Sequence, residues 1–154
     1  MIWASEKGYL EVVRELSKSG SNVNAALTTD GFTVLMNASQ DGHEDVVFEL
    51  CERGANVNAA QTDGGMTALM LASQEGHLEV VRELCERGAN VNAARTEDGY
   101  TALMLASHNG YLVVVHCLLD HGASKTALNL AGKNAYTYAG GNFKSTLQTL
   151  LRPY

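Results

Sequence analysis

Apolar and polar positions along the chain alternate with the spacing of short amphipathic helices. Within residues 78–86 the apolar side chains fall at i, i+1, i+4 and i+5, on one helical face: Val80, Val81, Leu84 and Cys85. The opposite face is charged, with partners three or four residues apart: Glu79, Arg82, Glu83 and Arg87. A shorter segment rich in helix formers precedes it, between a candidate cap at Thr67 and a candidate left-handed end at Gly76. The pattern predicts two helices, over 68–75 and 78–86.

The same pattern recurs every 34 residues, and residues 38–71 and 72–105 are identical at 26 of 34 positions. Ala38, Ala72 and Ala106 are therefore expected at equivalent points of stacked parallel helices. A polar stretch such as 89–99, which ends in an Asp-Gly dipeptide, separates successive helix pairs and is expected to form an extended, hairpin-like loop. One helix pair cannot bury both of its apolar faces alone, so neighbouring units must stack.

The recurring segment closely resembles the ankyrin repeat in the pattern D-G-x-T-A-L-M-L-A-S-x-x-G-H-L-E-V-V-x-x-L-x-x-x-G-A-N-V-N-A, over nearly the whole chain. The resemblance implies an all-α solenoid of stacked helix-turn-helix pairs with projecting hairpin loops, as a single domain over 1–154. We expect a partial repeat at 1–27, full repeats at 28–61, 62–95 and 96–128, and a C-terminal capping repeat at 129–154. The family's usual T-P-L-H is replaced, for example by Thr67-Ala68-Leu69-Met70, and the loops are one residue longer.

The last unit and one residue, Asn37, depart from the repeat. The last unit is degenerate, with Gly140-Gly141 expected to weaken its first helix. Its second helix keeps an apolar face of Leu147, Leu150 and Leu151 beside polar residues, as a cap requires. Asn37 stands where other units carry leucine, and an unsatisfied buried amide is costly, so the sequence predicts a higher melting temperature for Asn37→Leu unless Asn37 is solvent-exposed or bonds a partner.

Composition narrows the class of protein. With 154 residues, 45% hydrophobic and 18% charged, the chain can bury a core. The net charge of −6 argues against a nucleic-acid partner. No apolar run approaches the ~20 residues of a membrane span, and the first ten residues contain no secretory signal. Three cysteines do not form a disulfide framework, which indicates a reducing compartment, so we expect a cytoplasmic protein. We also expect a monomer without membrane partners.

Clusters that could carry chemistry are few. On one helix His116 and Asp120 share a face and Cys117 and His121 share another, so no four metal ligands converge. Cys51 and Cys85, at equivalent positions of helices about 8–10 Å apart, lie beyond disulfide distance and are expected to be core thiols. Cys117 stands where the preceding unit has a glutamate, and is expected to be the more exposed thiol.

Other polar side chains fit structural roles. His43 and His77 follow helix-ending glycines, and the asparagines are expected to bond backbone groups of the loops: Asn22, Asn24, Asn56, Asn58, Asn90 and Asn92. The triplet Asn37-Ala38-Ser39 lies inside a predicted helix and is discounted as a glycosylation site. No arrangement of catalytic residues stands out, so the sequence predicts no enzyme activity and no cofactor.

Positions that vary between the units predict the binding surface. In ankyrin repeats, partners contact hairpin tips and the exposed side of each first helix. The corresponding residues are Phe32, Met66, Tyr100, Gln40, Gln74, His108, Asp41, Glu75 and Asn109, with Lys133, Glu6 and Lys7 at the ends of these rows. We therefore expect a protein–protein interaction module that binds through its concave face. The alternatives are a spacer or designed repeat module without a natural ligand, and, for the large side chains, rings that fold onto their own hairpins.

Overall fold

Helices make up the regular secondary structure of the described residues, which in this computed structural model are 10–20, 22–26, 29–139 and 144–152. They are α2 (Leu10–Lys18), α3 (Val34–Gln40), α4 (Glu44–Glu52), α5 (Ala68–Glu75), α6 (Leu78–Glu86), α7 (Ala102–Asn109), α8 (Leu112–Asp120), α9 (Ala135–Tyr138) and α10 (Lys144–Leu151). Isolated antiparallel bridges close three hairpins: Ala26 with Thr33, Ala60 with Thr67, and Ala94 with Thr101. The predicted all-α solenoid is confirmed, and its central helices have the predicted bounds.

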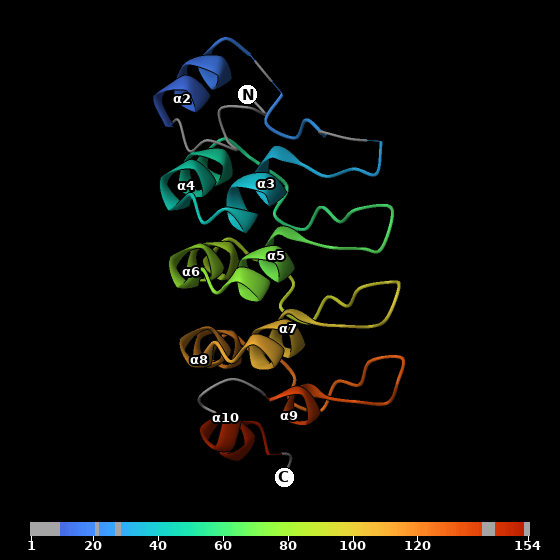
Figure 1. The fold of residues 1–154 in the computed structure, drawn as a ribbon. Helices are drawn as coiled ribbons and strands as arrows, with labels where there is room; N and C mark the ends of the chain where they lie inside the picture. Colours follow the sequence, from blue (N-terminus) through green and yellow to red (C-terminus); the bar gives the residue numbers. More distant parts are fainter. Residues whose placement is uncertain (1–9, 21, 27–28, 140–143, 153–154) are drawn as a thin grey trace.

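The helices stack in two rows, with the hairpins projecting from one side (Figure 1). The first row contains α3, α5, α7 and α9, and each of these helices contacts the next. The second row contains α2, α4, α6 and α8, which also contact in succession, and α10 packs against α9. Ala38, Ala72 and Ala106 are fully buried at equivalent places in α3, α5 and α7, as the 34-residue period predicts. We call the hairpins and first row the hairpin face, and the second row the outer face.

Each central first helix begins at a threonine and ends near a glycine. The Thr67 side chain accepts the N–H of Met70 at 3.3 Å, which satisfies one of the free donors at the start of α5. Gly76 adopts φ +85° directly after α5, a left-handed conformation that favours glycine. Both features were predicted. A side chain at Gly76 would also meet the ring of Tyr111, whose atoms lie 2.8–2.9 Å from the Cβ position.

The core forms where the two rows face each other. The apolar residues predicted for α6 are all buried, with Val80, Val81 and Leu84 at most 1% exposed. In α10, Leu147 and Leu151 are fully buried, so the predicted capping helix seals the end of the core. Gly140-Gly141 lies outside the described residues.

The environment of Asn37 differs from the expectation. The leucines at equivalent positions, Leu71 and Leu105, are 6% and 7% exposed, whereas Asn37 is only half-buried. Its amide is not sealed from water, so the cost of an unsatisfied buried amide does not apply. The predicted gain from Asn37→Leu required a buried amide, and the structure does not meet that condition.

Asparagine side chains connect each unit to the next. The Asn58 side chain accepts the N–H of Asn90 at 2.7 Å and donates to the carbonyl oxygen of Gly88 at 3.1 Å. Asn24 makes the same two contacts with Asn56 and Gly54, and Asn92 makes them with Ser124 and Gly122. The alternate asparagines close turns within a unit: the Asn56 side chain accepts the N–H of Asn58 at 3.0 Å. These contacts confirm the predicted role of the asparagines in bonding loop backbone groups.

Candidate functional site

The large side chains of the predicted row do not stand free on the hairpin face. Phe32, Met66 and Tyr100 are each half-buried and pack against the core. Part of each side chain therefore stabilises the fold, and only the remainder is open to a partner.

Arg95 joins two members of this row. Its guanidinium lies 3.7 Å from the sulfur of Met66 and 5.4 Å from the ring centroid of Tyr100. Asp98 holds the guanidinium from the same hairpin, with Arg95 Nε donating to Asp98 Oδ1 at 2.9 Å. This hydrogen bond lowers the pKa of Asp98, so the pair stays charged. The sequence reasoning missed Arg95, although its replacement of Gln61 in the preceding unit marks a variable position.

The row continues from the third hairpin into α9. The rings of Tyr100 and Tyr138 lie 4.8 Å apart, and burial together with the Tyr138 hydroxyl raises the pKa of Tyr100 to about 12. The Tyr138 hydroxyl accepts a hydrogen bond from Asn129 at 2.9 Å. His108 lies edge-on to the same ring at 6.2 Å, and the Lys133 ammonium lies 5.8 Å from its centroid. Tyr138 thus anchors an aromatic and cationic end of the hairpin face, which the degenerate last repeat concealed from the sequence reasoning.

The first helices place the other predicted residues near their C-terminal ends. Asp41, Glu75, His108 and Asn109 are exposed, while Gln40 and Gln74 are half-buried. Asn109 donates to the carbonyl oxygen of Gln74 at 2.9 Å, so these equivalent ends touch across neighbouring units. The structure therefore brings these positions into rows along the stack, whereas Glu6 and Lys7 lie outside the described residues.

Ion pairs cover the first part of the outer face. Glu49 in α4 accepts from Arg14 of α2 at 2.9 Å and from Arg53 at 2.6 Å, and these hydrogen bonds lower its pKa. Farther along, Arg87 bonds Glu52 of the preceding unit and Glu83 of its own. The pattern ends at α8, which carries His121 and Cys117 where α6 and its cap carry Arg87 and Glu83.

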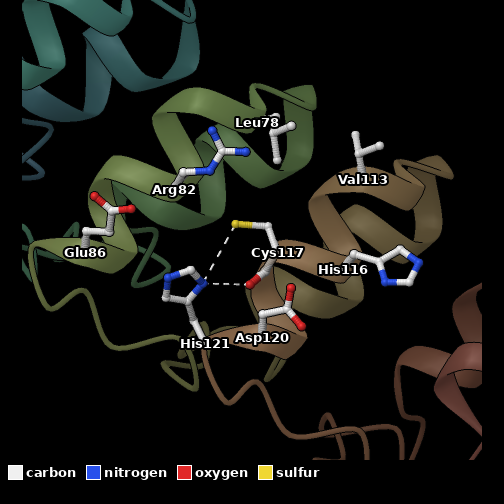
Figure 2. Close-up of a pocket in the computed structure, with 8 residues that line it drawn as sticks. All are labelled: Leu78, Arg82, Glu86, Val113, His116, Cys117, Asp120 and His121. Carbon is white, nitrogen blue, oxygen red and sulfur yellow. Dashed lines mark hydrogen bonds between the residues drawn. The ribbon is translucent and has the colours of Figure 1, made fainter.

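A groove of about 390 Å³ opens at this change, between α6 and α8 (Figure 2). Its lining residues are Leu78, Arg82, Glu86, Val113, His116, Cys117, Asp120 and His121. His121 Nδ1 lies 2.8 Å from the carbonyl oxygen of Cys117, which is the geometry of a cap on the end of α8. Throughout the described residues, no three His, Cys, Asp or Glu side chains are grouped so that they could hold a metal ion.

The three cysteines are free and buried. Cys51 and Cys85 are core thiols, as predicted, and burial raises their pKa to about 11 and about 12. The expectation that Cys117 is more exposed is wrong, because it is 9% exposed against 8% for the other two. Glu49, at the equivalent position of α4, is also 9% exposed, so a glutamate at this position in another unit does not mark the position as open to water.

His77 has a structural role. Its Nε2 lies 3.0 Å from the carbonyl oxygen of Gln40, and its ring occupies the space where a Cβ on Gly42 would be, 2.5 Å from Nδ1. These contacts agree with the structural role predicted for this histidine. Among the helices that the structure describes, none is both long enough and apolar enough to span a membrane.

Comparison with models of known protein families identifies the repeat. The family model for ankyrin repeats in three copies matches residues 1–95, and the model for a single ankyrin repeat matches residues 98–130. The chain belongs to the ankyrin repeat family. A search of curated proteins finds no match to it. Ankyrin repeats generally act as protein–protein interaction modules, and ankyrin repeat proteins are generally non-enzymatic scaffolds.

Proposed function

We propose that this chain binds a partner protein through its hairpin face. The observation that carries the proposal is that the repeated residues hold the units together, whereas the residues that vary lie mostly in the hairpins and at the ends of the first helices. Asparagines, threonine caps and glycines make the contacts within and between units, and they are the same in each central unit. Between residues 38–71 and 72–105, five of the eight differences lie in the hairpin or at the end of the first helix: Asp41/Glu75, Gln61/Arg95, Asp63/Glu97, Gly64/Asp98 and Met66/Tyr100.

The proposed binding residues follow from this variation and from exposure. Exposed side chains at the ends of the first helices would make polar contacts: Asp41, Glu75, His108 and Asn109. The half-buried residues Gln40, Gln74, Phe32, Met66 and Tyr100 would present their open edges between them. Rigid side chains lose little conformational entropy on binding, so the packed row Met66–Arg95–Tyr100 suits an interface centre.

The test must separate binding from folding. Because Phe32, Met66 and Tyr100 pack against the core, truncating them would destabilise the chain as well as the interface. The better variant is Gln74→Arg with His108→Ala, because these changes add bulk and charge at one site and remove a ring at the other. The matched control changes Glu86 and Asp120 to alanine, on exposed parts of the outer face.

Partners captured by the intact chain should be lost with the hairpin-face variant and kept with the control, at equal circular dichroism. Loss with the control alone would assign binding to the outer face and contradict the proposal. Recovery of no specific partner by the intact chain would favour the alternative of a structural spacer.

A further inference from the structure

The charge of the hairpin face changes along the solenoid. After the partial repeat at 1–27, the hairpin and first helix of the next two units carry two acidic residues each and no basic one: Asp30 and Asp41 in 26–41, Asp63 and Glu75 in 60–75. In the third unit, 94–109, Arg95 offsets one of two acidic residues. In the fourth, 128–138, the only charged residue is Lys133. One end of the face is therefore acidic and the other is basic.

The charges at the two ends are available to a partner. Asp41, Asp63 and Glu75 are exposed, and of these only Glu75 receives a hydrogen bond in the described structure, from Gln74 of the same helix. Lys133 is also exposed, with its ammonium over the ring of Tyr138 rather than beside a carboxylate. By contrast, the third unit's Arg95 and Asp98 are engaged with each other.

Distance makes the two ends act separately. Stacked helices lie about 8–10 Å apart, so α3 and α9, three steps apart in the first row, are separated by roughly 25–30 Å. The screening length at physiological salt is about 8 Å. The two ends are therefore about three screening lengths apart, so the acidic end and Lys133 each interact with a different part of a ligand.

This inference rests on the proposed function: we propose that the partner presents a protein segment whose charges are opposite to those of the hairpin face at each end. Its basic residues lie over the ends of α3 and α5, and an acidic residue lies against Lys133 and the Tyr138 ring. The polarity sets the direction in which the segment crosses the hairpins. Charge complementarity of this kind governs orientation and association rate more than total affinity.

A library of random peptides of about 16 residues, displayed on phage and selected against the intact chain, tests the segment directly; such peptides span the required length when extended. The test variant is Asp41→Lys with Glu75→Lys. Its control, Glu86→Lys with Asp120→Lys, makes the same change of net charge on exposed outer-face positions. All four substitutions place lysine near the C-terminal end of a helix, where a cation is favourable.

The intact chain and the control should enrich peptides with lysine or arginine in one half and aspartate or glutamate in the other. The test variant should lose the basic enrichment and bind the peptides selected by the intact chain about tenfold more weakly. Lys133→Glu should abolish only the acidic preference, whereas Lys144→Glu, on exposed α10, should leave it unchanged.

Peptides without charge bias, or equal weakening by the test and control variants, would overturn this inference and leave the hairpin face as a binding surface. Selected peptides that lose binding only with the outer-face control would instead overturn the proposed function. Failure of the intact chain to enrich any peptide would count against both.

Discussion

Asn58 provides the most direct test of how the units are held together. Its side chain accepts the N–H of Asn90 and donates to the carbonyl oxygen of Gly88, so Asn58→Ala removes two hydrogen bonds between neighbouring units. A typical hydrogen bond contributes about 1 kcal/mol net. Asn58 is exposed, and water can replace part of what is lost. We therefore expect Asn58→Ala to lower the free energy of unfolding by about 1–2 kcal/mol.

Urea denaturation followed by circular dichroism measures this loss as a lower midpoint at constant slope. For a chain of this length, about 1 kcal/mol corresponds to a melting-temperature shift of about 2–4 °C. Asn58→Asp keeps the acceptor and removes the donor, so it should fall between the intact chain and Asn58→Ala. The control Asn56→Ala removes one hydrogen bond within a loop and should cost less. A loss below about 0.5 kcal/mol for Asn58→Ala, or one no larger than for Asn56→Ala, would refute the assigned role.

Three further predictions test the packing and the ion pairs. Ser73 has a buried hydroxyl without a partner in the described residues, so Ser73→Ala should be neutral or raise the unfolding midpoint. Ser107→Ala removes a 2.6 Å hydrogen bond and should lower the midpoint. Gly88→Ala places a side chain in open space at φ +83° and should cost about 1–2 kcal/mol, whereas Gly76→Ala should cost more in the same denaturation assay because it also meets an aromatic ring. The folded-state pKa of Glu49 is lowered, so its contribution is present above its unfolded-state pKa and is lost as the pH falls through the folded value. Glu49→Gln should therefore lower the melting temperature at neutral pH, and by progressively less as the pH falls below the ordinary glutamate pKa of about 4.3.

Local rules and the repeat were sufficient to predict the central helices. Thr67, Gly76 and the apolar spacing within α6 define where each helix begins, ends and buries its face, and each signal depends only on residues a few positions away. Repetition then supplied the long-range information, because stacking equivalent units leaves few other arrangements.

Contacts between units were harder to predict wherever the repeat breaks down. The stack of Tyr100 on Tyr138 joins the third hairpin to the degenerate last unit, so no periodic position identified Tyr138 as its partner. The expected burial of Asn37 and the expected exposure of Cys117 were not found for a related reason. Both expectations were inferred from the residue type at equivalent positions. Side-chain length and the local environment decide exposure, and equivalence along the repeat determines only the backbone position.

The same distinction explains how the hairpin face can vary without loss of the fold. The hydrogen bonds between neighbouring hairpins run largely through backbone groups and asparagine side chains, as when Thr96 N–H bonds the carbonyl oxygen of Gly64 and Leu130 N–H bonds that of Asp98. Backbone donors and acceptors are present whatever the side chain, so glycine and aspartate serve equally as acceptors at this position. Charge at the hairpin tips can therefore change from unit to unit at little cost to stacking. A face assembled in this way can carry a gradient of charge that identical units could not.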